Sequence, residues 1–169
     1  YGHGLITPSI VKILENKSTF LSVNTQLNSF NSSFHSVSKY NKADYICVHS
    51  GELRHDYRNR NDSINSLIKR LYKSSNSKFI TITLGKKGSM VFNGNKFTHC
   101  PAFAQKIVDR VGAGDTLLAI TSLCFAGGID DRITLLLGNL SAAETVASAG
   151  TGNRLNKTNL LKTVETLLK

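Results

Sequence analysis

The 169-residue sequence has few cysteines and no long apolar run. Its three cysteines are odd in number and contain no C-x-x-C pair, so a disulfide framework is not expected. Cys47 and Cys124 lie in apolar runs, and we expect both to be buried thiols of a protein from the reducing cytoplasm. The longest apolar stretch, from Leu117 to Ile129, is too short and too rich in Thr, Ser and Gly to span a bilayer. No signal peptide is visible, so no membrane partner is expected.

Two common nucleotide-binding patterns are also missing. The sequence has no Walker A pattern, G-x-x-x-x-G-K-[ST]. It has no dinucleotide fingerprint either, because Leu117 stands where a third glycine would follow Gly112 and Gly114. Internal repeats and low-complexity tracts are absent. The chain begins at Tyr1, and its one methionine is Met90, so we expect it to be part of a longer polypeptide.

Positive charge is in excess, with 21 Lys and Arg against 11 Asp and Glu and a net charge of +10. A basic surface suits an anionic partner: a nucleotide, a sugar phosphate, a nucleic acid or an anionic lipid. The basic residues are dispersed along the chain without a block of like charge. Dispersion favours a role in solubility over a nucleic-acid groove, and no nucleic-acid partner is expected.

Apolar periodicity and turn residues predict alternating strands and helices in a single domain over residues 1–169. Helices are expected after Thr7-Pro8 to about Leu14, between His49 and Tyr72, and over Ala113 to Ala126, Asp131 to Ala149 and Asn156 to Leu168. Strands are expected at Phe20 to Asn24, Asp44 to His49, Lys78 to Leu84, and in a hairpin of Ser89 to Asn93 with Lys96 to Cys100. Residues Gln26 to Asn41 are expected to form a loop with one short helix. This order predicts an α/β sandwich with a mostly parallel sheet and an inserted hairpin.

The segment from Asp109 to Asp115, Asp-Arg-Val-Gly-Ala-Gly-Asp, precedes a predicted helix. Glycines allow the backbone to approach a phosphate, and a helix N-terminus supplies oriented N–H donors. Asp115 in the first turn can accept the proton of an attacking hydroxyl, so the segment is suited to phosphoryl transfer. The alternative is that Asp115 only stabilises the helix start, by about 0.3–1 kcal/mol.

Three further segments admit both a functional and a structural interpretation. Thr83-Leu-Gly-Lys-Lys-Gly88 follows a strand and is either a nucleotide loop or an ordinary connection. Glu52, in His49-Ser-Gly-Glu52 after a buried strand, is a candidate to hold Mg²⁺ through water. Zinc at His49, Glu52 and His55 is less favoured, because His55 falls off the shared helical face. Asn139 and the small residues Ser141 to Ala143 either pack closely or leave a slot for adenine.

Taken together and in this order, these segments resemble the carboxy-terminal half of the ribokinase-like (PfkB) carbohydrate kinases. Asp109 to Asp115 resembles the family pattern D-T-x-G-A-G-D, and Thr83 to Gly88 resembles its upstream T-x-G-x-x-G loop. Tyr1-Gly-His-Gly4 resembles the D-Y-x-K-G segment of heptose-7-phosphate kinase modules in bifunctional heptose kinase/nucleotidyltransferases, which serve cell-surface glycan synthesis.

The resemblance implies ATP-dependent phosphorylation of a sugar or sugar-phosphate hydroxyl. Asp115 is then the catalytic base, and Gly112, Ala113 and Gly114 form the anion hole. The implied ATP-binding residues are Thr83, Gly85, Lys86, Gly88, Val108, Asn139 and Ala143. Glu52 corresponds to the acid of an N-x-x-E motif that influences Mg²⁺, while Asp109, Val111 and Gly150 correspond to a monovalent-cation site, with K⁺ as the candidate. A homodimer and fusion to a nucleotidyltransferase are compatible with the same resemblance.

The chain departs from the family pattern in three positions and in length. His49 replaces the asparagine of N-x-x-E, Arg110 replaces the signature threonine, and Asn24-Thr-Gln26 replaces a D-P-K-like segment. Family members are about twice as long, and their amino-terminal half carries most sugar contacts and a lid. We therefore expect this chain to bind adenine nucleotide weakly and to phosphorylate sugars poorly. The alternatives are a nucleotide-binding regulatory module without phosphoryl transfer and, from net charge alone, a nucleic-acid-binding domain.

Overall fold

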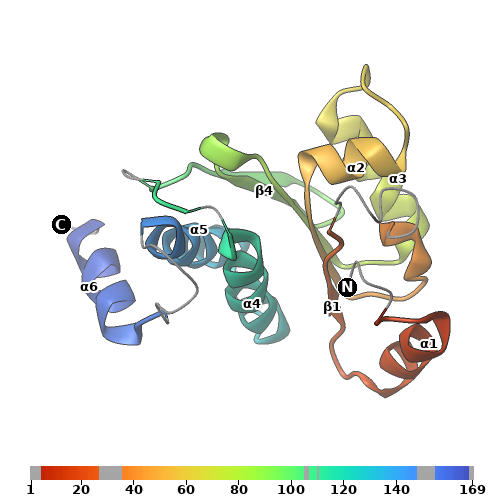
Figure 1. The fold of residues 1–169 in the computed structure, drawn as a ribbon, viewed down its shortest axis with the longest axis horizontal. Helices are drawn as coiled ribbons and strands as arrows, with labels where there is room; N and C mark the ends of the chain where they lie inside the picture. Colours follow the sequence, from red (N-terminus) through yellow and green to blue (C-terminus); the bar gives the residue numbers. More distant parts are fainter. Residues whose placement is uncertain (1–4, 27–35, 105–106, 110, 148–154, 168–169) are drawn as a thin grey trace. The chain divides into compact units, whose positions relative to one another are not determined.

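The computed structural model describes residues 5–26, 36–104, 107–109, 111–147 and 155–167. The chain divides into two compact units. Unit 1 comprises Tyr1–Leu84 with Met90–Thr98, and unit 2 comprises Gly85–Ser89 with His99–Lys169. Figure 1 colours the elements along the chain from red to blue.

Helices and strands follow the predicted order. The helices are α1 (Pro8–Lys17), α2 (Ser50–Asp56), α3 (Ile64–Ser75), α4 (Ala113–Ala126), α5 (Asp131–Ala147) and α6 (Lys157–Leu167). The strands are β1 (Ser22–Val23), β2 (Tyr45–His49), β3 (Phe79–Thr83), β4 (Ser89–Phe92) and β5 (Phe97–Cys100). Two short 3-10 turns are η1 (Val37–Lys39) and η2 (Gly85–Lys87).

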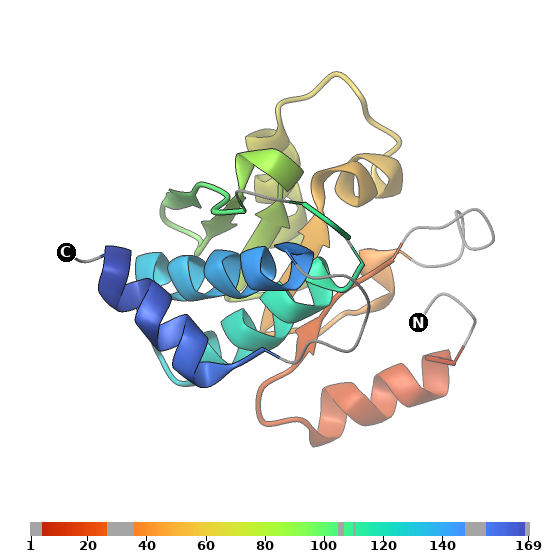
Figure 2. The same ribbon diagram turned by 60° about the vertical axis from the view of Figure 1, so that its left-hand side comes forward.

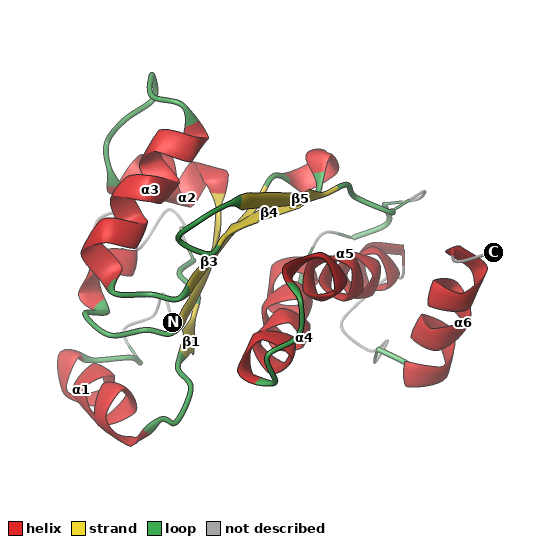
Figure 3. Ribbon diagram, turned by 180° about the vertical axis from the view of Figure 1, so that it is seen from behind, coloured by secondary structure: helices red, strands yellow, loops and turns green. Residues whose placement is uncertain are grey.

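The described strands form a five-stranded sheet in the order β1-β2-β3-β4-β5. Strand β2 pairs in parallel with both β1 and β3, and His49 lies opposite Thr83 at the carboxyl ends of β2 and β3. Strands β4 and β5 are joined by the predicted tight turn, in which the Asn93 N–H donates to the Lys96 carbonyl at 3.4 Å. The strands are yellow in Figure 3. The prediction of an α/β fold with parallel strands and an inserted hairpin is confirmed.

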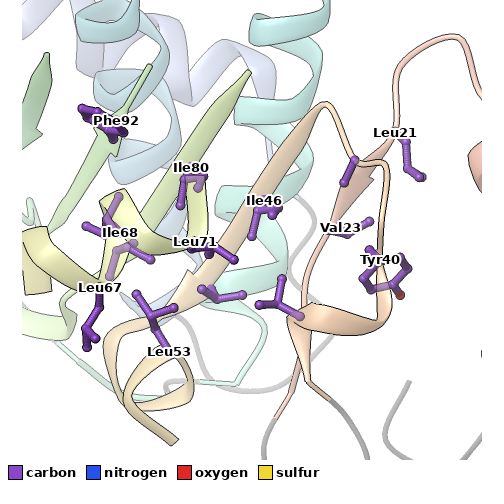
Figure 4. Packing of buried hydrophobic residues seen from close by; sticks show 14 of the residues in the cluster. Leu21, Val23, Tyr40, Ile46, Leu53, Leu67, Ile68, Leu71, Ile80 and Phe92 are labelled. Carbon is purple, nitrogen blue, oxygen red and sulfur yellow. The ribbon is translucent and has the colours of Figure 1, made fainter. Parts of the chain in front are cut away.

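The core of unit 1 lies between one face of the strands and helices α1, α2 and α3. Ile46 of β2 and Ile80 of β3 lie opposite each other, are fully buried, and contribute to the same cluster (Figure 4). Leu53 of α2 and Leu67 and Leu71 of α3 are buried in the same cluster. Alternation along the strands therefore sends one set of side chains to these helices.

Local sequence signals set where the helices of unit 1 begin. The Thr7 side chain accepts from the Ile10 N–H and precedes Pro8, as predicted for the start of α1. The single helix-prone region expected between His49 and Tyr72 is instead two helices. Ser63 caps a second start, with its hydroxyl accepting from the Ser66 N–H at 3.2 Å, and α3 runs on to Ser75.

Parts of some predicted elements lie outside the described residues. Phe30 and Phe34 of the expected short helix lie outside the described residues, whereas Val37 lies in η1. Ala149 and Leu168, the expected last residues of two helices, also lie outside the described residues. The predicted bounds of Ala113–Ala126 match α4.

In unit 2, helices α4 and α5 lie side by side (Figure 2). Gly138 of α5 makes the approach close, since a Cβ there would lie 2.6 Å from Thr121 Cγ2 of α4. The expectation that Cys124 is buried is wrong: it is half-buried, whereas Cys47 and Cys100 are buried. The buried residues of α4 are Leu117, Thr121 and Phe125, and the apolar run reaches the surface at Leu123, which is 72% exposed. Among the described residues, no helix has the length and apolar character needed to cross a membrane.

Candidate functional site: the first turn of helix α4 and its neighbours in unit 2

Helix α4 begins at Ala113 without a side-chain cap. Its N-cap is Gly112, which adopts a left-handed conformation (φ 82°) that favours glycine. The Thr116 N–H donates to the Gly112 carbonyl at 2.9 Å as the first bond of the helix. The three N–H groups before it, from Ala113 to Asp115, have no carbonyl one turn earlier in the helix to bind. The first turn therefore presents donors for an outside acceptor.

The space beside this turn is open. Within the residues that the structure describes, an ideal Cβ on Gly114 would meet no atom of another segment within 4 Å. Asp115 lies in the first turn, and its side chain is exposed. The N–H groups and the open space suit a phosphate group, and the exposed carboxylate beside them suits a proton acceptor. Stabilisation of the helix start by Asp115 is compatible with the same geometry.

Asp109 organises the segment that leads into the helix. Its Oδ1 accepts from the Val111 N–H at 2.9 Å. The Val108 and Asp109 N–H groups donate to the Val146 carbonyl of α5, at 2.8 and 3.3 Å. Val108 and Val111 themselves are exposed, and Gly150, the third residue of the predicted cation site, lies outside the described residues.

The predicted nucleotide loop forms the 3-10 turn η2 and then turns sharply at Gly88. The Gly88 N–H donates to the Gly85 carbonyl at 3.0 Å. Gly88 has a φ of 86°, and a Cβ there would lie 2.1 Å from the Cys100 carbonyl oxygen, so a side chain cannot fit. The side chain of Lys86 is exposed, and an ideal Cβ on Gly85 would meet no described atom within 4 Å. The loop thus keeps an open outer side and a closely packed inner side.

Asn139 of α5 is buried and contacts the end of this loop. Its amide Nδ2 donates to Ser89 Oγ at 2.7 Å and to the Leu135 carbonyl at 2.8 Å. Burial raises the pKa of the nearby Cys100 thiol, and a hydrogen bond with Asn139 lowers it in part. Ala143, one turn later on α5, is half-buried. These contacts explain the buried asparagine structurally and leave its predicted contact with adenine a prediction.

Thr83 and Glu52 belong to unit 1, at the carboxyl ends of β3 and β2. Glu52 Oε2 accepts from the His49 N–H at 2.6 Å, and His49 Nδ1 accepts from the Gly51 N–H at 3.1 Å. This reciprocal pair caps helix α2. In the part of the chain that the structure describes, no three His, Cys, Asp or Glu residues are grouped as a metal site. The magnesium contact of Glu52 stays a prediction.

The sequence-based prediction missed Thr145 and Ser89. Thr145 Oγ1 of α5 donates to Thr116 Oγ1 in α4 at 3.0 Å, and Ser89 receives the Asn139 amide. A weak signal for Thr145 was present, since Ser141 and Thr145 stand one helical turn apart and place two hydroxyls on one side of the helix. The partners could not be predicted from that spacing.

Comparison with known proteins adds independent information. The model of the pfkB family carbohydrate kinases matches residues 9–159. The "Bifunctional protein HldE" of Koribacter versatilis is 30% identical over 155 residues, which is 89% of this chain and 31% of that protein. The HldE of Campylobacter jejuni strain RM1221 is 29% identical over 154 residues, or 32% of its length. The chain thus spans about a third of the curated relatives it matches.

Solved structures show the same fold. A ribokinase of Arabidopsis thaliana, complexed with ribose and ATP, matches with a TM-score of 0.78 at 19% identity, over 94% of this chain and 51% of that one. The phosphofructokinase-2 of Escherichia coli in complex with substrates and products matches with a TM-score of 0.75 at 15% identity. That match covers 95% of this chain and 51% of the phosphofructokinase chain. The observed fold is therefore ribokinase-like, and the chain covers about half of these structures.

Proposed function

Because the chain belongs to the pfkB family of carbohydrate kinases, we propose that it holds ATP and transfers its γ-phosphoryl group to a hydroxyl of a sugar or sugar phosphate. The observation that carries the proposal is the uncapped first turn of α4, with open space at Gly114 and the exposed carboxylate of Asp115. This turn begins within the Asp109 to Asp115 segment, which resembles the family pattern with Arg110 in place of its threonine. Catalysis of phosphoryl transfer depends mainly on positioning and on stabilising charge, which such a turn can supply.

In the proposed reaction, Asp115 accepts the proton of the sugar hydroxyl while the hydroxyl oxygen forms a bond to the γ-phosphorus. The bond from that phosphorus to the departing ADP oxygen breaks. The N–H groups of Ala113, Gly114 and Asp115 donate to the oxygens of the transferred group, with Gly112 shaping the turn. Thr83, Gly85, Lys86, Gly88, Val108, Asn139 and Ala143 form the remaining proposed ATP contacts.

Cations complete the proposal. Magnesium, when bound, neutralises charge on the phosphates. Glu52 is the residue proposed to reach it through water, beyond its contact with the His49 N–H. Asp109, Val111 and Gly150 are proposed to hold a monovalent cation such as K⁺.

The substrate proposed is a heptose phosphate, because the sequence of Tyr1 to Gly4 resembles a segment of heptose-7-phosphate kinase modules and the relatives at about 30% identity bear the name bifunctional protein HldE. A nucleotidyltransferase as the second function of the whole protein and a homodimer as its assembly belong to the same proposal. A cytoplasmic location is proposed because ATP is the phosphoryl donor and Cys47, Cys100 and Cys124 are free thiols.

The test is calorimetric titration with ATP, together with a γ-labelled transfer assay sensitive to single turnovers, on the wild type and Asp115→Asn. The variant keeps ATP binding, and transfer falls by about 10²–10⁴-fold because the general base is lost. Glu165→Gln, an exposed position on α6, is the matched control and leaves both unchanged. Undiminished transfer by Asp115→Asn would refute the assigned role.

A second candidate is a nucleotide-binding module without phosphoryl transfer. It is favoured by the capping pair at α2, in which Glu52 binds the His49 N–H and His49 stands where the family pattern has asparagine. That module would bind ATP in the same titration, and Asp115→Asn would change nothing in a transfer assay that is blank for the wild type.

A further inference from the structure

We propose that helix α5 sets the spacing between the two ATP-binding segments of unit 2 through Asn139 and Thr145, which act as positioning residues. For Asn139 this role is additional to its proposed contact with ATP. This inference rests on the proposed function. The two side chains lie on one helix, yet each bonds to a different segment of the site: Asn139 to Ser89 and Thr145 to Thr116.

Asn139 fixes the end of the nucleotide loop. Ser89, its partner at 2.7 Å, directly follows Gly88 and is fully buried, while Asn139 is 6% exposed. On the loop's inner side, Gly88 packs against the Cys100 carbonyl. His99 Nε2 lies 3.0 Å from the Lys87 carbonyl, which adds a second link to β5. Movement of the loop end thus requires breaking a buried hydrogen bond to α5.

Thr145 supports the first turn of α4. Its hydroxyl lies 3.0 Å from Thr116 Oγ1, one residue after Asp115, and 3.1 Å from the Ser141 carbonyl of its own helix, so its one proton is shared between these two acceptors. Its Cγ2 lies 3.8 Å from the position that a Cβ on Gly112 would take. The Thr116 N–H in turn donates to the Gly112 carbonyl. One side chain therefore bonds to the Thr116 end of the turn that carries the proposed anion hole and lies near its Gly112 end.

Val146, the residue after Thr145, holds the segment that precedes the first turn of α4. Its carbonyl accepts from the Val108 and Asp109 N–H groups. Thr145 follows Asn139 by six positions in the continuous helix α5, or about 9 Å along the axis. Since a packed helix is stiff, α5 holds the loop end and the α4 turn at a set separation.

The two hydrogen bonds then affect binding of different parts of the ligand. The loop contacts the portion that ATP and ADP share, so loss of the bond from Asn139 to Ser89 weakens the binding of both nucleotides. The α4 turn contacts the γ-phosphate, so loss of the bond from Thr145 to Thr116 weakens the binding of ATP alone. A residue that only stabilised the fold would not change the ratio of the two affinities.

The experiment measures ATP and ADP dissociation constants by calorimetry, with thermal melting of each variant as a check on folding. Thr145→Val keeps the shape and loses the hydroxyl, so ATP binding weakens about 3–10-fold while ADP binding changes less than twofold. Thr145→Ser keeps the hydroxyl and retains the wild-type ratio. Asn139→Ala weakens ATP and ADP by equal factors of about 3–10.

A double-mutant cycle tests the link from Asn139 to Ser89. Ser89→Ala is expected to act in the same direction, and the double variant is expected to bind no more weakly than Asn139→Ala alone. Thr166→Val on α6 is the matched control, because that exposed hydroxyl donates to the Lys162 carbonyl of its own helix rather than to another segment. If Asn139→Ala fails to fold, Ser89→Ala tests the same hydrogen bond from the other side. If Thr145→Val fails to fold, Thr116→Val likewise tests the bond between Thr145 and Thr116.

The outcomes separate this inference from the function on which it rests. A wild type that binds no ATP overturns both. A wild type that binds ATP more tightly than ADP, with a ratio unchanged in Thr145→Val and Thr116→Val, overturns the role of Thr145 only. Additive effects of Asn139→Ala and Ser89→Ala overturn the link between Asn139 and the loop.

Discussion

Thr81, in the middle of β3, offers a sharp test of how hydroxyl groups are buried in this fold. It is fully buried, and within the described residues its Oγ1 has no hydrogen-bond partner. Its neighbour across the parallel pair is Cys47 of β2, which is also buried. A buried hydroxyl without a partner costs about 1–3 kcal/mol. Thr81→Val replaces that hydroxyl by a methyl group and keeps the β-branched shape that suits a strand.

The expected result is a gain in the free energy of unfolding of about 1–2 kcal/mol, since the desolvation cost disappears and apolar burial increases. For a chain of this size, that gain corresponds to a rise in melting temperature of about 3–6 °C. Urea and thermal denaturation followed by circular dichroism measure both quantities.

Thr121→Val is the matched control. Thr121 is equally buried, but its Oγ1 donates to the Leu117 carbonyl at 2.7 Å. The same exchange there loses a hydrogen bond worth about 0.5–1.5 kcal/mol, so it stabilises less than Thr81→Val or destabilises. Equal effects of the two substitutions, or a lower melting temperature for Thr81→Val, would contradict the assignment of an unsatisfied hydroxyl.

Two further predictions concern the site and the pH dependence of stability. Gly114→Ala raises the free energy of unfolding by about 0.5–1 kcal/mol, because alanine favours the helix and a Cβ meets nothing there, yet its methyl group enters the open space and weakens ATP binding in calorimetry. Burial alone would raise the pKa of Asp44, but hydrogen bonds from the Leu21 N–H and from Lys78, with the charge of Lys78, hold that pKa below its usual value. The Asp44 carboxylate therefore stabilises the folded protein fully at pH values above its pKa in the unfolded chain. This stabilisation is lost as the pH falls through the lower pKa of Asp44 in the folded protein. The urea midpoints of the wild type and Asp44→Asn should accordingly differ near neutral pH and converge below about pH 4. A difference between the two midpoints that stays constant as the pH is lowered would argue against the ion pair.

Local signals predicted most of the elements because their causes lie within a few residues. Thr7 before Pro8 marks the start of α1, and the turn after Asn93 marks the hairpin. The first turn of α4 follows from Gly112 and the acid at Asp115, which act on backbone groups directly beside them. The second start at Ser63 was a local signal as well, because Asn59, Asn61 and Asp62 before it favour turns and caps, but the prediction overlooked it.

The amino-acid sequence alone thus predicts the order of strands and helices, the family resemblance from Asp109 to Asp115, and the start of the helix that carries this segment. The tertiary structure alone decided which side chains meet across the site. Asn139 bonds to a residue 50 positions away, and Thr145 to one 29 positions away. It also decided that Cys124 is half-buried. Helical periodicity orders the side chains of one element, but the partner and the burial of each depend on which other element packs against it.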